Sequence, residues 1–126
     1  MANARTDASA NAVLDAEPPL YGALSSTPFN NAGGGGTEPV AGDYVRPLLT
    51  FAAASGRQRV TTAIADFISG GGNAASTVGT LQYIGLFTAA SGGTLRWKGQ
   101  LTVPVAWVVG SPVEIAPGNI AIAEPV

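Results

Sequence analysis

The chain has 126 residues, with 6 Lys+Arg against 8 Asp+Glu, and it contains neither histidine nor cysteine. This length suits one domain, and the missing residue types exclude imidazole bases, thiolate nucleophiles, disulfides and the usual zinc and haem ligand sets. Charged residues make up 11 % of the chain, less than half of the roughly 25 % usual in soluble proteins. With a net charge of -2 and no apolar run near the roughly 20 residues of a membrane-spanning helix, we expect binding to neither nucleic acid nor membrane.

Residues 1–19 are predicted to form an N-terminal arm, and residues 20–126 a β-domain. A short helix over residues 8–16 fits the arm, because two prolines follow it and capping side chains precede or begin it. The side chains available for its N-cap are Asp7 and Ser9. Such a helix offers only Val13 and Leu14 for burial, and the cost of helix nucleation means that it needs a packing partner. We therefore expect it to be a docking element.

Strand patterns dominate the rest of the chain. Glycine-rich loops separate runs of alternating or continuous apolar residues. About eight short strands at regular spacing, with no long helix, are typical of an antiparallel β-sandwich, here jelly-roll-like. In chain order, the expected strands cover residues 20–24, 46–53, 60–68, 81–87, 94–101 and 103–109, followed by a C-terminal hairpin.

Two consecutive predicted strands have opposite patterns of polarity. In residues 94–101, Arg96, Lys98 and Gln100 alternate with apolar side chains, which predicts one core face and one solvated face. Residues 103–109 are apolar on both faces, which predicts burial on both faces. A domain this small has a limited interior, so we expect one face of this strand to pack against another subunit. The residues that would form this contact are Val105, Trp107 and Val109.

The C-terminal hairpin has a definite predicted register. The Pro-Gly dipeptide at 117–118 suits the two central positions of a type II turn. That turn would pair Ile115 with Ile120 and Val113 with Ile122. These four large side chains would then share one face of the hairpin.

Several short patterns resemble functional motifs, and each has a simpler interpretation. Residues 70–75 satisfy G-x-G-x-x-A, but no helix pattern and no suitably placed acid follow them, so we interpret them as a loop. Arg96 and Lys98 lie on the face opposite Trp97, which favours a solvated strand over a nucleic-acid surface. No spacing selects a catalytic pair among the acids of the β-domain, which are Asp43, Asp66, Glu114 and Glu124. We predict no catalytic, cofactor-binding or metal-binding residue.

Four large aromatic side chains have a polar atom that suits an interface or a sugar-stacking platform. They are Tyr44, Tyr83, Trp97 and Trp107. For Tyr83 and Trp97 we favour core packing, since such rings are mostly buried in small β-domains. Trp107 lies on the strand that is apolar on both faces, which favours a subunit contact for it.

Three segments resemble a family of small tailed-bacteriophage virion proteins. They read DYVRPLLTF at residues 43–51, YIGLFTAASGGTLRW at 83–97 and GQLTVPV at 99–105. The most specific part is GLFTAASGG, and the resemblance extends to the helix pattern at 11–15 and the strand pattern at 20–24. Members are described as head decoration (cement) proteins or as tail-fibre-like proteins. The resemblance implies an all-β structural protein without catalytic residues.

This resemblance leads us to expect a trimeric capsid decoration protein that binds the major capsid protein on the outer surface of the phage head and stabilises it. The alternative is a tail-fibre module that binds a receptor or a carbohydrate. We expect synthesis in the host cytoplasm, because residues 1–7 lack the apolar stretch of a secretory signal. The candidate residues for contacts with other subunits or with the capsid are Val13, Leu14, Tyr44, Val105, Trp107 and Val109.

Overall fold

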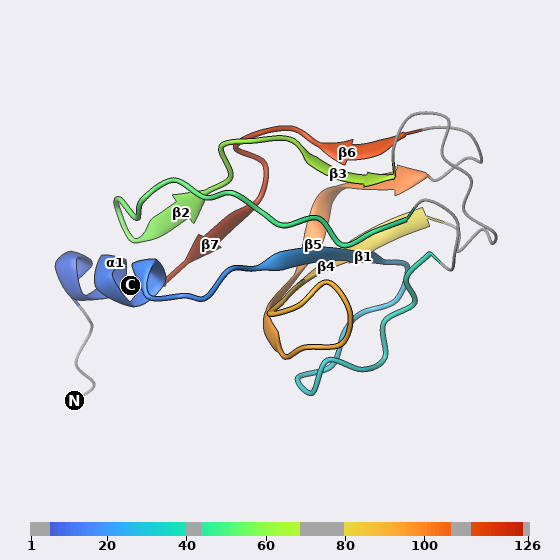
Figure 1. Ribbon diagram of the computed structural model, residues 1–126, viewed down its shortest axis with the longest axis horizontal. Helices are drawn as coiled ribbons and strands as arrows, with labels where there is room; N and C mark the ends of the chain where they lie inside the picture. Colours follow the sequence, from blue (N-terminus) through green and yellow to red (C-terminus); the bar gives the residue numbers. More distant parts are fainter. Residues whose placement is uncertain (1–5, 40–43, 69–79, 107–111, 125–126) are drawn as a thin grey trace.

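The computed structural model describes residues 6–39, 44–68, 80–106 and 112–124 (Figure 1). Within these ranges the chain forms one helix followed by seven strands, and every strand pairing is antiparallel. The predicted all-β fold with a short N-terminal helix is therefore confirmed. The elements are α1 (Asp7–Asp15), β1 (Tyr21–Ser25), β2 (Gln58–Val60), β3 (Ala65–Ile68), β4 (Thr80–Phe87), β5 (Leu95–Ala106), β6 (Val113–Ile115) and β7 (Ala121–Ala123).

The strands form one three-stranded sheet and two small ladders. The sheet has the order β1-β4-β5, while β2 pairs with β7 and β3 pairs with β6. In Figure 1, β3 and β6 run beside the C-terminal end of β5, and β2, β7 and α1 lie toward the other end of the molecule. The β3-β6 ladder packs on the sheet, because a Cβ added at Gly22 of β1 would lie 3.1 Å from the Phe67 ring of β3. The sheet and the β3-β6 ladder are thus two packed layers, as expected for a sandwich, and they are in contact through β1 and β3.

Helix α1 has a different cap from the one predicted. Thr6, and neither Asp7 nor Ser9, is the N-cap residue, and its Oγ1 accepts a hydrogen bond from the backbone N of Ser9 at 3.2 Å. Ala10 and Leu14 on the inner side of the helix are fully buried. The short helix therefore packs against the rest of its own chain, which supplies the packing partner that it needs.

Two side-chain oxygens also fix the helix to the turn before β2. Asn11 Oδ1 accepts a hydrogen bond from the backbone N of Arg57, and Asp15 Oδ1 accepts one from the backbone N of Ala54, both at 2.9 Å. Both acceptors lie on α1, and both donors lie about 40 or more residues away in the sequence. Helix α1 is thus an integral part of the folded domain.

The first predicted hairpin is shorter in the structure. Residues 46–53 contribute only isolated bridges, and residues 60–68 are divided between β2 and β3. Pro47 has no N–H to donate to a ladder, which explains why a continuous strand does not form there. The predicted turn is present: Gly56 (φ 59°) and Arg57 (φ 67°) adopt the left-handed conformation that a two-residue hairpin turn needs.

The predicted alternation in the first half of β5 is confirmed. Leu95, Trp97 and Leu101 are partly buried, whereas the three polar residues between them are exposed. Trp97 and Leu101 pack against the larger apolar core, whereas Leu95 packs against a separate cluster formed by Ala23, Phe29 and Phe87.

The second half of β5 is not covered on both faces by its own chain. Val103 is 75 % exposed, and Val105 is half-buried. The cause is a wide bulge: Leu81 pairs with Val105 and Tyr83 with Gln100, so that residues 101–104 have only one residue of β4 opposite them. In addition, β5 is the last strand of its sheet, and no further strand in the described ranges pairs with its outer edge.

The C-terminal turn was predicted correctly. Gly118 has a φ of 84°, and the backbone N of Asn119 donates to the carbonyl of Ala116 at 3.3 Å, as a type II turn with proline at its second position requires. The other residues of the turn, Ala116, Pro117 and Asn119, are exposed.

The strands on either side of this turn do not pair with each other, so the predicted pairs Ile115–Ile120 and Val113–Ile122 are wrong. Strand β6 pairs with β3, and β7 pairs with β2. The reason is that Thr61 bonds to both sides of the turn: its carbonyl accepts from the turn glycine N at 2.7 Å, and its N donates to the carbonyl of Ile120 at 3.0 Å. The chain between β2 and β3 takes the place of the expected partner strand.

Two apolar clusters stabilise this arrangement. The larger one lies between the three-stranded sheet and the β3-β6 ladder, and its fully buried members include Leu14, Leu24, Phe67 and Leu81. The smaller one contains Ala23, Phe29 and Phe87, with the two rings edge to face at 5.5 Å between centroids. The sheet is therefore packed against side chains on both of its faces.

Candidate functional site

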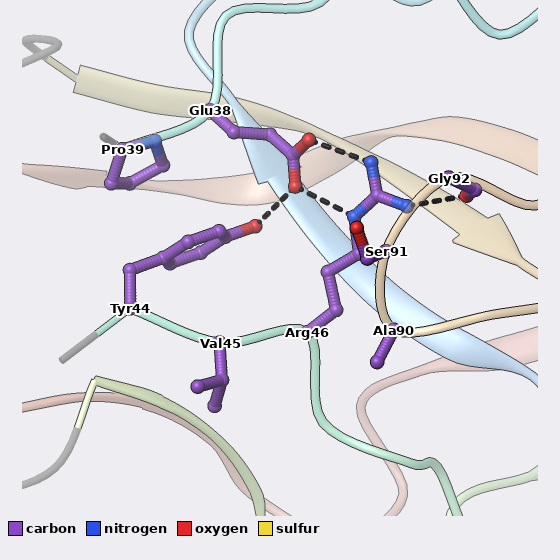
Figure 2. Close-up of a pocket in the computed structure, with 8 residues that line it drawn as sticks. All are labelled: Glu38, Pro39, Tyr44, Val45, Arg46, Ala90, Ser91 and Gly92. Atoms are coloured by element: carbon purple, nitrogen blue, oxygen red, sulfur yellow. Dashed lines mark hydrogen bonds and ion pairs between the residues drawn. The ribbon is translucent and has the colours of Figure 1, made fainter. Parts of the chain in front are cut away.

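Three segments meet at the pocket in Figure 2, and one of them is distant from the other two in the sequence. They are the segment that ends at residue 39, the segment that begins at residue 44, and the loop between β4 and β5. The pocket has a volume of about 240 Å³. It is lined by Glu38, Pro39, Tyr44, Val45, Arg46, Ala90, Ser91 and Gly92.

Glu38 is the centre of a hydrogen-bond network in this pocket. Its Oε1 accepts from Tyr44 Oη at 2.7 Å and from Arg46 Nε at 3.0 Å, and its Oε2 accepts from Arg46 Nη2 at 2.8 Å (Figure 2). Arg46 Nη1 also donates to the carbonyl of Gly92 at 3.0 Å, and the guanidinium lies 4.0 Å from the centre of the Phe87 ring. We call Glu38, Tyr44 and Arg46 the Glu38 brace, because together they join all three segments.

The electrostatics of the Glu38 brace are those of a structural element. Burial raises the pKa of the Tyr44 phenol well above its ordinary value of about 10, and the carboxylate of Glu38 raises it further. The backbone N of Leu24, which donates to Tyr44 Oη at 3.1 Å, opposes this shift in part. The hydrogen bond to Glu38 raises the pKa of Arg46. Tyr44 therefore stays neutral and Arg46 stays charged at physiological pH, so neither is suited to proton transfer there.

We expect the free energy of unfolding to fall as the pH rises above about 10. In the unfolded chain Tyr44 loses its proton near that pH, whereas in the folded chain its raised pKa keeps the proton bound. Since the unfolded state then binds fewer protons, stability declines with rising pH. Urea unfolding at about pH 9 and about pH 11 measures the decline. Tyr44→Phe should show a smaller decline, and equal declines in both proteins would contradict this role of Tyr44.

A second carboxylate connects the N-terminal arm to β5. The Glu17 side chain is only 8 % exposed, and its Oε1 accepts from Trp97 Nε1 at 2.8 Å. Its Oε2 accepts from Arg96 Nη2 at 2.8 Å and from Arg96 Nε at 3.1 Å. The arm is thereby bonded to the edge strand of the sheet.

Sequence reasoning identified neither Glu17 nor Glu38 as a site residue. Glu17 and Arg96 are 79 residues apart, Glu38 belongs to a segment without a strand or helix pattern, and Arg46 begins a predicted strand that the structure does not form. One signal was available: in a chain with so few charges, each charged residue is a candidate for a specific internal partner. Arg96, which we expected on a solvated face, has such a partner.

A larger groove lies between the second half of β5 and the chain around β6. Its volume is about 590 Å³, and its lining is mostly apolar. It is formed by Leu101, Thr102, Val103, Val105, Glu114, Ile115, Ala116 and Asn119. One lining residue, Glu114, pairs directly with Asp66 in the β3-β6 ladder. Both residues are exposed. The structure thus brings together two acids that no sequence spacing had selected.

The predicted contact residues lie in different environments. Val13 is exposed on α1, whereas Leu14 is fully buried in the larger core and is not accessible to a second molecule in this structure. Tyr44 belongs to the Glu38 brace, and Val105 lines the groove beside β6. Outside the described residues lie Asp43, Trp107, Val109 and residues 70–75.

The two aromatic residues for which core packing was predicted lie within the described residues. Trp97 packs against the larger core, as predicted, and Tyr83 is half-buried on β4. In the described ranges, no group of three or more His, Cys, Asp or Glu side chains could hold a metal ion. The helix found there, α1, lacks the length and apolar character needed to cross a membrane.

The comparison with known families gives a match over nearly the whole chain. The family model described as Podophage GP4 fiber I protein gp80 matches residues 2–123. No curated protein matches the chain. The family match confirms the resemblance to phage virion proteins at the level of a fibre-type family, and it does not single out head decoration proteins. Because it covers far more than half of the 126 residues, the chain belongs to the Podophage GP4 fiber I protein gp80 family.

Proposed function

We propose that the protein is a non-enzymatic structural subunit of the virion of a tailed phage, located in a fibre. The family match over residues 2–123 carries this proposal, because its description names a fibre protein. The expected alternative of a tail-fibre module therefore has better support than the capsid decoration role. The protein would then lie in a fibre and not on the surface of the head shell.

The use of charged side chains supports a structural role. Four acids of the described ranges form ion pairs with arginines, which fixes the arm, the turn before β2 and the pocket loops in place. The pairs are Asp7–Arg57, Asp15–Arg59, Glu17–Arg96 and Glu38–Arg46. Charged groups held in this way stabilise one conformation rather than take part in turnover.

The proposal does not include a glycan-binding site. Two of the four candidate aromatics already use their polar atoms inside the chain, Tyr44 with Glu38 and Trp97 with Glu17. A sugar-stacking platform needs an exposed ring, and Trp97 packs against the core. A homotrimer, as expected from the sequence, remains our proposal for the assembled state.

Immunogold labelling of intact virions with antibody against the purified protein tests the location. We expect gold particles at the tail or its fibres and none on the head shell. Labelling spread over the head surface would contradict the fibre proposal and would favour capsid decoration. Virions that lack the labelled protein altogether would contradict a structural role of either kind.

A further inference from the structure

The groove beside β5 is bordered by two strands that each have an unpaired edge. Strand β5 is the last strand of the sheet β1-β4-β5, and β6 has β3 as its one ladder partner among the described residues. An unpaired strand edge offers a row of backbone N–H and C=O groups to another strand. Within the described ranges, β5 and β6, whose side chains line the groove, can therefore each accept one more strand.

The side chains of the groove favour a protein partner. Val103 is the most exposed large hydrophobic residue in the described part of the chain, at 75 %. Around it, the groove is lined by further apolar side chains from β5 and β6. Isolated exposed apolar residues are common on protein surfaces, but a contiguous apolar groove beside an open strand edge is typical of an interface.

The charged side chains on β3, β5 and β6 indicate the chemistry of the partner protein. Four arginines of the described ranges pair with acids inside the chain. Lys98 on β5 is exposed; its Nζ donates to the carbonyl of Phe29 at 3.4 Å, and it forms no ion pair with an acid of the described residues. Asp66 and Glu114 are exposed, lie directly opposite each other and have no cationic partner among the described residues. Like charges placed opposite each other in a ladder are destabilising, so a cation beside them would be favourable.

The positive charge of Lys98 is complementary to the negative charges of Asp66 and Glu114, and Lys98 and Glu114 lie on the two strands with unpaired edges. The cation is on β5, and one of the two acids is on β6. One chain cannot use β5 to fill the groove that its own β5 borders, but a second copy brings the same strand with the same lysine. The charge pattern therefore matches a contact between copies without any other component.

We propose that the groove between β5 and β6 seats strand β5 of a second copy of this chain, with Lys98 of that strand beside Glu114 and Asp66. The contact combines strand pairing, burial of Val103 and a charge interaction at the margin. This inference rests on the proposed structural role, since it specifies how copies of a fibre subunit meet. It does not depend on where in the virion the assembly is attached.

Sedimentation velocity of the purified full chain, with charge exchange at two positions, tests this contact. We expect the wild-type protein to self-associate, and Lys98→Glu and Glu114→Lys each to raise the dissociation constant by about tenfold or more, because like charges then face each other. The double variant Lys98→Glu/Glu114→Lys should return to within about threefold of the wild type. Circular dichroism must show that each variant is folded.

Three results would overturn the proposal: a wild-type chain that stays monomeric at all concentrations, single variants that associate like the wild type, or a double variant that associates no better than either single variant. Exposed residues tolerate these changes, and Glu114→Lys even places a cation opposite Asp66 within the same ladder. Loss of self-association together with fibre labelling of the virion would overturn this contact alone and leave the proposed function in place.

Substitution of a hydrophobic residue of the groove gives an independent measurement of the same contact. Val103→Asp should weaken self-association by at least about tenfold, because it puts a charge into the apolar groove. Leu48→Asp is the matched control, since Leu48 is also exposed but bridges to β1 at the opposite edge of the sheet. Equal effects of the two substitutions would argue against a contact specific to the groove.

Discussion

Phe67→Ala is expected to lower the free energy of unfolding by about 4 kcal/mol. The Phe67 ring is fully buried in the larger core, and it fills the space above Gly22 between the β3-β6 ladder and the sheet. Removing it loses the burial of an aromatic side chain and leaves a cavity that the backbone of two layers cannot easily close. Because domains of this size have a total stability of about 5–15 kcal/mol, a large share would be lost. Urea unfolding followed by circular dichroism measures the change.

Phe51→Ala is the matched control for this substitution. Phe51 is only partly buried at the margin of the same core, with the Arg59 guanidinium 5.5 Å from the centre of its ring. We expect it to cost less than half as much as Phe67→Ala, since solvent can fill the space that it leaves. Similar losses from the two substitutions would show that the contact between the layers at Phe67 is not the main stabilising feature.

Glu38→Ala is expected to lower the free energy of unfolding by about 3 kcal/mol. The substitution leaves the Arg46 guanidinium, whose side chain is only 14 % exposed, without its carboxylate, and it removes the acceptor of the Tyr44 hydroxyl. A buried charge without its partner is costly because the protein offers it little solvation. Thermal unfolding at neutral pH measures this effect.

Asp7→Ala provides the comparison for Glu38→Ala. It also removes an ion pair with a buried arginine, since Asp7 Oδ1 lies 3.2 Å from Arg57 Nη1, but the Asp7 side chain itself is 75 % exposed. Solvent can therefore take the place of its carboxylate, and Arg57 Nε keeps its hydrogen bond to the carbonyl of Glu124 at 3.1 Å, so we expect a small change, of about 1 kcal/mol. If Glu38→Ala costs no more than Asp7→Ala, the Glu38 brace does not have the structural role that we assign to it.

Local patterns in the sequence predicted those features of the fold that depend on local chemistry. The alternation in the first half of β5 depends on which side chains point toward the core, and the turn at Gly118 depends on the backbone freedom of glycine. Both are confirmed. The pairing of β6 and β7 failed because turn chemistry does not specify the partner strand, and Thr61 competes for the same backbone groups.

The candidate site was less predictable than the fold. The Glu38 brace joins three segments, and neither of its charged residues lies in a strand or helix. The groove depends on a bulge at residues 101–104 that leaves apolar side chains uncovered, whereas the apolar pattern alone predicted burial. What the apolar pattern did predict is that this strand needs a partner beyond its own sheet, and that remains the proposal here.

The pairing of β6 and β7 with β3 and β2 has a consequence for how the protein is made. Residue 115 lies opposite residue 65, and residue 123 lies opposite residue 58, so both ladders close loops of about 50 or more residues. Such non-local pairing makes folding slow compared with that of helical domains of similar size. The β3-β6 ladder cannot form on the ribosome until residues 113–115 have emerged, and the β2-β7 ladder cannot form until residues 121–123 have emerged. The groove bordered by β6 does not exist before β6 has emerged. Assembly of copies through that groove would therefore select chains synthesised at least as far as Asn119.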